Sequence, residues 1–276
     1  MIHFKPITDK EFHKFSALIF QQSGIFLKPE KKELLNARLG KRLRQLRINS
    51  FAAYYDEVVN DASGRELTCL INSVSTNFTS FFREKAHFDY LSSRVFPDFI
   101  QKNRGDRRFS CWSAACSSGE EPYTLAIILN DFFESHPGYH CSIIATDIST
   151  KVLSQAKQGI YGMDRVSQLP VPVLKKHFRK GTGKCAGFVK VKEHLRRLLT
   201  FQHFNLMDRF SWEKKFHVVF CRNVMIYFNH ETQQQLVKKF YNSLAPGGYL
   251  FIGHSESLAN IDHQFKQVAT TAYQRK

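Results

Sequence analysis

The sequence predicts an α/β fold: a mostly parallel sheet with an antiparallel edge strand, a small inserted antiparallel β-subdomain and a small all-helical N-terminal domain. Three observations favour this class. Apolar runs of strand length alternate with helical patterns from residue 91 to 276, as in sheets whose parallel strands are joined by helices. Residues 1–75 show helical periodicity throughout. Residues 188–192 alternate with a period of two and interrupt the α/β rhythm, which places the insertion at about residues 171–200.

Length and charge narrow the classes of function. A chain of 276 residues suits one main domain and a smaller one. The net charge of +16 indicates an anionic partner, and composition alone leaves nucleic acid, anionic lipid and an acidic protein surface open. No apolar run is long enough to span a bilayer, and the first residues lack a signal peptide's apolar core. We therefore expect a cytoplasmic protein.

The cysteines and histidines predict neither disulfides nor a metal site. The six cysteines include no C-x-x-C pair, and the histidines include no H-E-x-x-H motif. Cys111, Cys141 and Cys221 fall in apolar strand-like runs, so we expect buried, reduced thiols at these positions.

The N-terminal domain is predicted to consist of four helices. Thr8 and Glu11 form a capping-box pattern ahead of the first one, and Ser50 is expected to cap the third. The second helix, within residues 31–47, carries seven cations: Lys31, Lys32, Arg38, Lys41, Arg42, Arg44 and Arg47. This basic face is either solvated or a docking surface, and composition leaves both readings open.

Residues 76–90 are expected to link the domains and to contribute to a ligand pocket. A polar cluster interrupts their aromatic run: Asn77, Thr79, Arg83 and Glu84. A semi-buried arginine requires an anionic partner, which makes Arg83 a candidate binding residue. A helix predicted over residues 88–102 then leads into the main sheet.

The stretch after that helix predicts the crevice in which an open α/β sheet holds a nucleotide-like cofactor. A strand at 109–112 precedes a turn of small residues and a helix that Ser117 or Ser118 is expected to cap. Glu120 and Glu121 stand where a phosphate cradle has free N–H groups and a cation. The site therefore favours ammonium or hydroxyl groups over phosphate. The helix dipole explains Glu120, whereas Glu121 is expected to contact the ligand.

Two later strands end in polar residues that are expected to face the same crevice. Asp147 follows a strand at 141–146, where an acidic residue usually holds a ribose diol, although it can also cap the next helix. Arg222 and Asn223 follow a fourth parallel strand at 216–221.

The remaining elements complete the predicted sheet. They are a helix at 151–159, a strand at 198–204, a helix at 231–244, a strand at 249–253 and a last strand at 265–273. Gly247 and Gly248 are interpreted as a hairpin turn that leads to the antiparallel edge.

Five separated strings closely resemble the chemotaxis receptor glutamate O-methyltransferases, the CheR family. They are NFTSFFRE at 77–84, WSAACSSGEEPY at 112–123, ATDIS at 145–149, FCRNVMIYF at 220–228 and PGGYLFIGHSES at 246–257. The resemblance covers essentially the full length. It implies the Rossmann-like fold of S-adenosylmethionine-dependent methyltransferases, with residues 91–276 as the catalytic domain. It also implies S-adenosyl-L-methionine as cofactor, S-adenosyl-L-homocysteine as product and the methylation of receptor glutamates.

The resemblance also assigns site residues. The cofactor-binding positions that it implies are Asn77, Thr79, Arg83, Glu121, Asp147, Asn205, Leu206, Arg222 and Asn223. Asp147 is assigned to the ribose hydroxyls, and Asn205 and Leu206 to the adenine. Arg83 and Tyr227 are the catalytic candidates: Arg83 for holding a carboxylate, Tyr227 for orienting one through its hydroxyl.

Partners follow from the same resemblance. The basic helix 31–47 is expected to face the methylation helices of membrane chemoreceptors. The turn between Gly181 and Gly183 resembles one that docks a receptor's C-terminal peptide in some members, and a solvated loop is the alternative. The expected location is the cytoplasm, peripheral to receptor arrays at the inner membrane, with no nucleic-acid partner and no membrane insertion.

Two alternative functions stay open. The charge suits a nucleic-acid methyltransferase, but residues 222–225 lack the D/N-P-P-Y/F turn that enzymes acting on base amino groups generally carry. A non-catalytic receptor-binding or cofactor-sensing module is the other alternative.

Overall fold

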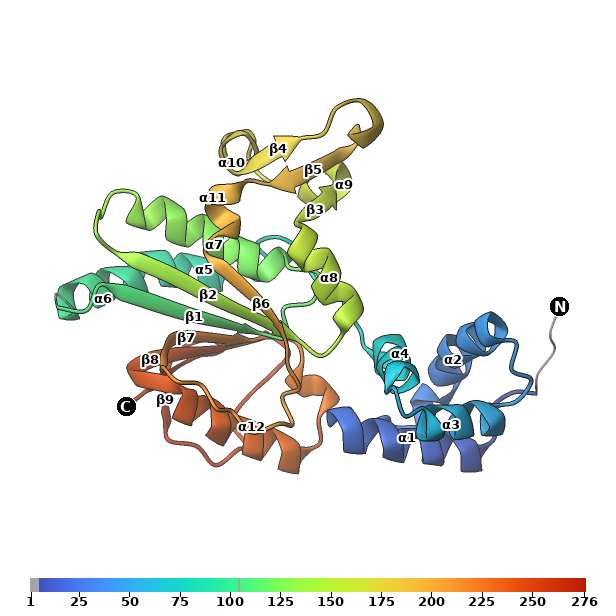
Figure 1. Ribbon diagram of the computed structural model, residues 1–276. Coiled ribbons are helices and arrows are strands. Elements are labelled where there is room, and N and C mark those ends of the chain that lie inside the picture. The colour runs from blue at the N-terminus through green and yellow to red at the C-terminus, as the bar shows by residue number, and fades with distance from the viewer. Residues whose placement is uncertain (1–4, 104) are drawn as a thin grey trace.

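A computed structural model describes residues 5–103 and 105–276 of the chain (Figure 1). The first four residues of the predicted N-terminal domain, and Arg104, lie outside the described residues. Helices come first along the chain, followed by a seven-stranded sheet and, inserted into it, a three-stranded β-subdomain. The predicted fold class is therefore confirmed.

Four helices build the N-terminal part around their own apolar core. They are α1 (Asp9–Ser23), α2 (Lys32–Leu46), α3 (Phe51–Asn60) and α4 (Arg65–Val74), with a 3₁₀ turn at Pro29–Lys31. The Thr8 side chain accepts the N–H of Glu11, whose carboxylate accepts the N–H of Thr8, so the predicted capping box begins α1. Phe15, Leu39 and Tyr54 are fully buried in this core.

Part of the basic face of α2 is used inside the N-terminal part. Lys32 pairs with Asp9 at 2.7 Å, and Arg42 forms an ion pair with Glu66 of α4. Arg38 donates to the carbonyl oxygen of Val74 at 2.6 Å. The cations that remain exposed include Lys31, Lys41 and Arg47, so the surface available to a partner is smaller than the sequence pattern indicates.

The main sheet has five strands that pair parallel to one another, followed at one edge by two strands that pair antiparallel. In spatial order they are β6 (Leu199–His203), β2 (His140–Asp147), β1 (Arg108–Ala114), β7 (Phe216–Cys221), β8 (Leu244–Ile252), β10 (Ala272–Arg275) and β9 (Phe265–Ala269). The chain runs outward from β1 through β2 to β6 and then returns to β7 on the other side of β1. This reversal places a crevice beyond the carboxyl ends of β1 and β7.

Two predictions about the sheet edge are wrong. The last strand is a hairpin of β9 and β10, because Thr271 takes a left-handed φ of 58° and reverses the chain. Gly247 and Gly248 form no hairpin, since β8 already begins at Leu244 and pairs parallel to β7. A Cβ at Gly248 would lie 2.9 Å from the carbonyl oxygen of Ala245, which explains the glycine.

Helices cover both faces of the sheet. Figure 1 shows α5 (Ala86–Tyr90), α6 (Phe96–Lys102) and α7 (Glu120–Phe133) on one face and α12 (His230–Ser243) on the other. A π-helical turn at Leu91–Val95 makes α5 and α6 one continuous helical segment. Helix α8 (Thr150–Gln158) follows β2. Trp112 of β1 is fully buried in the core beneath α12, where its ring contacts Phe240.

The β-subdomain is a separate antiparallel sheet of β3 (Ile160–Gly162), β5 (Phe188–Val191) and β4 (Phe178–Lys180), in that order. Short helices connect these strands: α9 (Met163–Val166), α10 (Val171–His177), a 3₁₀ turn at Gly183–Cys185 and α11 (Glu193–Arg196). The small sheet thus begins earlier than the expected residue 171, because β3 supplies its first strand. The predicted strand at 198–204 is confirmed as a strand of the main sheet at residues 199–203.

Hydrogen bonds among the described residues tie the N-terminal part to the main domain. The Asn205 amide donates to the Gln22 carbonyl at 2.7 Å, and the Phe26 N–H donates to the Tyr227 carbonyl at 2.8 Å. Asn72 of α4 contacts the Thr150 hydroxyl at 3.2 Å. Within the described residues, no helix has both the length and the apolar character that crossing a membrane requires.

Candidate functional site

A cavity that is open to solvent lies at the carboxyl ends of β1 and β7 and, together with the solvent space at its mouth, encloses about 990 Å³. The structure brings together there all ten residues that the sequence singles out: Asn77, Thr79, Arg83, Glu121, Asp147, Asn205, Leu206, Arg222, Asn223 and Tyr227. The ten residues come from five separated segments, so only the folded chain assembles the pocket.

The loop between β1 and α7 approaches the cavity with its backbone. Ala115 and Ser117 take left-handed φ values of 63° and 51°, and Gly119 has 98°. The Ser117 N–H donates to the Asp147 carboxylate at 2.8 Å, and its hydroxyl donates to the Asn77 carbonyl at 2.9 Å. The predicted serine cap is wrong, because Gly119 is the N-cap residue of α7 and no side chain caps it.

The side chains of Glu120 and Glu121 lie in different environments, Glu121 at the cavity and Glu120 beneath the surface beside α9. Glu121 lines the cavity, where it accepts the Ser113 hydroxyl at 2.7 Å and lies 3.4 Å from Arg222. Burial raises the pKa of Glu121, and the charge of Arg222 opposes that rise. Glu120 is fully buried and forms an ion pair with Arg165 of α9. The helix dipole is therefore an incomplete explanation of Glu120.

Asp147 ends β2 with both carboxylate oxygens engaged by the backbone. Oδ2 accepts the Ser117 N–H and Oδ1 accepts the Ser149 N–H, each at 2.8 Å. Burial raises the pKa of Asp147, and these N–H groups oppose the rise. Each oxygen keeps a free lone pair. Asp147 thus lines the cavity and also orders the start of α8, so the two interpretations of this residue are compatible.

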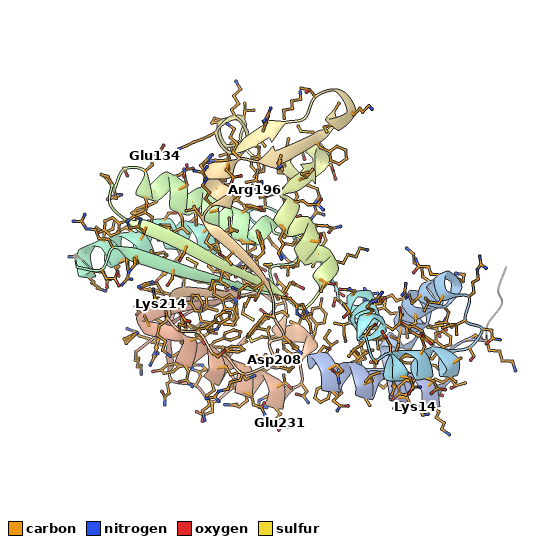
Figure 2. All side chains as sticks on the ribbon, in the orientation of Figure 1. Lys14, Glu134, Arg196, Asp208, Lys214 and Glu231 are labelled. Atoms are coloured by element: carbon orange, nitrogen blue, oxygen red, sulfur yellow. The ribbon has the colours of Figure 1, made fainter. Side chains whose placement is uncertain are left out.

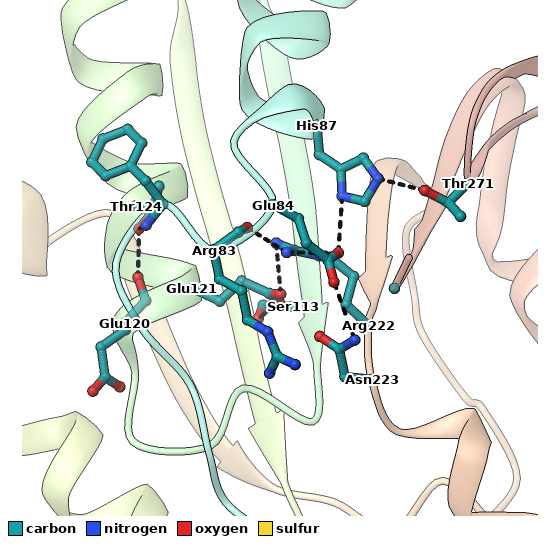
Figure 3. Close-up of polar contacts among 12 residues, drawn as sticks. Arg83, Glu84, His87, Ser113, Glu120, Glu121, Thr124, Arg222, Asn223 and Thr271 are labelled. Atoms are coloured by element: carbon teal, nitrogen blue, oxygen red, sulfur yellow. Dashed lines mark hydrogen bonds and ion pairs between the residues drawn. The ribbon is translucent and has the colours of Figure 1, made fainter. Parts of the chain in front are cut away.

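Arg83 lies in the cavity wall without a protein carboxylate. Its Nη1 donates to the Phe78 carbonyl at 2.9 Å, and its guanidinium stands 5.5 Å from the centre of the Phe78 ring. Among the described residues, none offers it a carboxylate within 4.0 Å. Figure 3 shows the guanidinium directed away from the pair formed by Glu84 and Arg222. Arg83 is therefore available to an anionic group of a ligand.

Glu84 organises the opposite wall, and sequence reasoning gave it no role. Its carboxylate lies 3.0 Å from Arg222 Nη2 and accepts the Asn223 amide and the His254 N–H, each at 3.2 Å (Figure 3). Burial raises the pKa of Glu84, but Arg222 and these donors outweigh it, so the pKa is lowered. The sequence feature that could have identified Glu84 as a site residue is its place in the polar cluster that begins at Asn77.

His87 lies behind this pair and is almost fully buried. The Thr271 hydroxyl donates to the Thr270 carbonyl at 2.7 Å, so it accepts from Nε2–H of His87, also at 2.7 Å. The neutral ring then leaves Nδ1 as a buried acceptor without a partner, 3.7 Å from Glu84. Burial, reinforced by Arg222, lowers the pKa of His87 to about 4.

Glu84, His87 and His254 also form a group of potential metal ligands, with donor atoms within 4.8 Å of one another. The guanidinium of Arg222 already neutralises the carboxylate in this group. A second cation at this position would be repelled by Arg222. We therefore describe the cluster as a support for Arg222.

A second buried carboxylate that sequence reasoning missed is Glu256. It accepts the N–H groups of Asn223 and Val224 at 2.9 Å and of Met225 at 2.8 Å. Burial raises the pKa of Glu256 against the effect of these donors. The Glu256 contacts hold Asn223 at a left-handed φ of 57°. Glu256 lies in the family-like string at 246–257, which could have identified it, but no residue of that string was predicted to belong to the site.

The remaining pocket residues lie on the side of the N-terminal part. Asn205 donates to the Gln22 carbonyl and accepts the Met207 N–H at 3.0 Å, so its amide fixes the loop that carries Leu206. Lys239 of α12 donates to the carbonyl oxygens of the same loop at 2.9–3.1 Å. Tyr227 lies in a 3₁₀ turn, Met225–Tyr227, that follows β7.

These groups fit the cofactor that the resemblance implies. Asp147 offers lone pairs to hydroxyl groups, and Arg83 offers an unpaired guanidinium to a carboxylate. Glu121 presents a carboxylate to the cavity. The backbone of the Ala115–Gly119 loop faces the cavity directly through Ala115, Cys116 and Ser117.

Comparison with known proteins identifies the family. The family model "CheR methyltransferase, all-alpha domain" matches residues 10–75, and "CheR methyltransferase, SAM binding domain" matches residues 77–274. The chemotaxis protein methyltransferase of Escherichia coli is 37% identical over 268 residues, which cover 97% of this chain and 91% of that protein. Chemotaxis protein methyltransferase 2 of Pseudomonas aeruginosa is 38% identical over 267 residues, covering 96% and 93%.

A third relative, the chemotaxis protein methyltransferase of Borreliella burgdorferi, is 38% identical over 256 residues, covering 91% of this chain and 89% of that protein. The model matched by residues 77–274 describes a SAM binding domain, which agrees with the cofactor expected from the sequence, S-adenosylmethionine. The chain therefore belongs to the CheR family of chemotaxis methyltransferases.

Proposed function

We propose that the protein transfers a methyl group from S-adenosylmethionine to glutamate side-chain carboxylates of membrane chemoreceptors and so forms glutamyl methyl esters. The observation that carries this proposal is the cavity at β1 and β7, where Arg83 has no protein carboxylate and faces the space that a ligand would fill. An anionic acceptor or the cofactor carboxylate satisfies that guanidinium.

The chemistry needs no general base. The bound cofactor supplies a methyl group on a positively charged sulfur. A lone pair of a carboxylate oxygen would form the new C–O bond, and the electron pair of the breaking C–S bond would pass to sulfur. The positive charge on sulfur and the negative charge on the carboxylate would then both be neutralised. A glutamate is ionised at neutral pH, with a pKa of about 4.3. The protein therefore has to exclude water and align the two groups, which can supply about 7–11 kcal/mol.

The site residues are given the roles that the family resemblance implies. Arg83 holds a carboxylate, either that of the cofactor or that of the incoming glutamate. Tyr227 orients a carboxylate through its hydroxyl. Asp147 accepts the ribose hydroxyls, and Glu121 stabilises the cationic end of the cofactor. Arg222 is kept in place between Glu84 and Glu121 by the ion pairs at 3.0 and 3.4 Å.

The remaining wall residues surround the adenosine and methionine parts. Asn77 and Thr79 border the methionine end, and Leu206 flanks the adenine beside Asn205. Asn223 completes the wall after β7 and is held by Glu84 and Glu256.

Receptor recognition is assigned to two basic surfaces. The exposed cations of α2 suit the acidic methylation helices of a receptor. Strand β4 is an edge of the small sheet and carries exposed Arg179 and Lys180, which suits the addition of a receptor's C-terminal peptide as a further strand near Gly181 and Gly183. Figure 2 shows nitrogen-tipped side chains projecting from the β-subdomain. Such tethering would raise the local concentration of substrate helices at cytoplasmic receptor arrays.

One assay tests the proposal. The protein is incubated with methyl-labelled S-adenosylmethionine and either receptor-containing membranes or RNA, and the products are then treated with mild alkali. Label on receptor protein that is released as methanol supports a carboxyl methyl ester. Alkali-stable label on RNA would contradict the proposal in favour of a nucleic-acid methyltransferase. No label on either substrate would favour a binding module.

A further inference from the structure

Glu120 is a fully buried carboxylate that the proposed methyl transfer does not use. It heads α7 directly before Glu121, which lines the cavity. The Ser118 hydroxyl donates to it at 2.6 Å, and its cationic partner is Arg165 of the β-subdomain. A buried carboxylate needs such a cation, since the dipole of a helix alone compensates little of the cost of burying its charge.

Arg165 makes a second contact, with another wall of the cavity. Its Nη2 donates to the carbonyl oxygen of Thr79 at 3.0 Å. Thr79 lines the cavity from the linker, whereas Glu120 begins the helix behind Glu121. One guanidinium of the β-subdomain therefore fixes two walls of the cofactor pocket relative to each other.

Tyr161 of β3 holds the same region through a separate contact. Its hydroxyl donates to the Ser118 carbonyl at 2.8 Å, and its ring packs edge-on against Phe81 at 5.0 Å. A Cβ on Gly119 would lie 2.8 Å from the Tyr161 oxygen. The β-subdomain thus contacts the backbone of the loop that lines the cavity.

This loop has a physical need for support from outside the pocket. Ala115 and Ser117 hold left-handed backbone conformations, which are strained and persist only where neighbouring groups hold them in place. On the pocket side, Asp147 and Asn77 hold Ser117. On the outer side, Tyr161 holds the loop at Ser118.

We propose that Arg165 and Tyr161 are positioning residues for the cofactor pocket. They keep the Ala115–Gly119 loop and the first turn of α7 in the conformation that binds S-adenosylmethionine. The β-subdomain therefore contributes to cofactor affinity although neither side chain lines the cavity. This inference concerns cofactor binding alone and is independent of which group accepts the methyl.

The test measures the dissociation constant for S-adenosylhomocysteine by calorimetry, well below the melting temperature of each variant. In Arg165→Met the loop is expected to relax in the unbound protein, and binding then has to restore the strained conformation. A cost of about 1.4 kcal/mol for this step raises the dissociation constant about tenfold, which is the expected change. Arg165→Lys keeps the charge with fewer donors and is expected to fall between Arg165→Met and the wild type. Tyr161→Phe keeps the ring and removes only the hydroxyl, so a smaller weakening of about threefold is expected.

Three controls separate positioning from folding. Arg165→Met together with Glu120→Gln removes the uncompensated buried charge and is expected to fold and still bind about tenfold more weakly. Arg197→Met removes an arginine whose side chain is 78% exposed, and its affinity is expected to match the wild type. In turnover assays, the KM for S-adenosylmethionine is expected to rise in the Arg165 variants while kcat at saturating cofactor stays near the wild-type value.

Wild-type affinity in both the double variant and Tyr161→Phe would overturn the inference, whether or not their melting temperatures fall. Those results would make Arg165 and Tyr161 structural residues only.

Discussion

Arg222 and Glu84 form an ion pair at 3.0 Å although they are 138 positions apart in the chain. Their side chains are only 2% and 12% exposed, and the pair joins the linker to the end of β7. Because Arg222 also lies 3.4 Å from Glu121, the pair positions one wall of the pocket against the start of α7. This contact gives Glu84 a role that its position in the sequence does not reveal.

Replacing Glu84 is expected to destabilise the fold. Glu84→Ala leaves Arg222 buried without its nearest carboxylate, and we expect a loss of about 3 kcal/mol in the free energy of unfolding, measured by urea denaturation. The matched control is Lys85→Ala, which breaks an ion pair with Asp89 whose side chains are 69% and 60% exposed. That loss is expected to stay below about 1 kcal/mol. Equal losses in the two variants would contradict the role of Glu84.

His87 is expected to make the fold sensitive to mild acid. Its pKa is lowered to about 4 in the folded protein by burial and by Arg222, against about 6.5 when unfolded. The unfolded chain binds the extra proton between these values, so stability is lost as the pH falls from 6.5 to 4. The full contribution is about 3 kcal/mol.

The variant His87→Gln isolates this contribution, because Glu84, Arg222 and His254 stay in place around the position. Unfolding free energies of both proteins are measured from pH 7 to pH 4. The wild type is expected to lose more stability than the variant over this range. Parallel curves would show that His87 does not titrate in this window.

Lys239 is expected to support the adenine side of the pocket from α12. Its ammonium group donates hydrogen bonds to the carbonyl oxygens of Leu206, Met207 and Asp208. Lys239→Met removes these bonds, and we expect the dissociation constant for S-adenosylhomocysteine to rise about tenfold, as for a loss of roughly 1.4 kcal/mol. The exposed neighbour Lys238 serves as the control, since Lys238→Met is expected to bind like the wild type. Unchanged affinity in both variants would remove Lys239 from the site.

Replacing Arg83 tests directly whether its guanidinium takes part in methyl transfer. Arg83→Ala is expected to lower turnover by at least about 100-fold, the usual effect of removing a charged donor from the reacting groups. The fold is expected to stay intact, because the Arg83 side chain makes one hydrogen bond to the protein, at the Phe78 carbonyl. Arg94→Ala removes an exposed arginine of the following helical segment and is expected to keep normal turnover. Normal turnover in Arg83→Ala would exclude Arg83 from the mechanism.

Periodicity and local signals were enough to predict much of the fold. The capping box at Thr8, the parallel strands and the antiparallel insertion follow from patterns within a few residues. The hairpin of β9 and β10 was missed because its turn at Thr270 and Thr271 contains none of the glycine, asparagine or aspartate residues that mark left-handed positions.

The candidate site was predictable where each residue follows a strand or a recognisable string, as for Asp147, and all ten predicted residues line one cavity. The residues that hold the site residues in place were not predictable, because their contacts join segments that are far apart in the sequence. Arg165 meets Glu120 from 45 positions away, and Glu256 meets Asn223 from 33 positions away. The strings at 77–84 and 246–257 contain Glu84 and Glu256, but no local pattern identifies the partner of either carboxylate in another segment.

The central claim is that the methyl group goes to a glutamate carboxylate of a chemoreceptor. The most direct measurement is tandem mass spectrometry of receptor peptides after incubation with methyl-deuterated S-adenosylmethionine, with Arg83→Ala as the paired sample. We predict a deuterated methyl ester on glutamate side chains with the wild type, and its near-complete loss with the variant. Label on lysine or arginine side chains, or equal labelling by both proteins, would contradict the account.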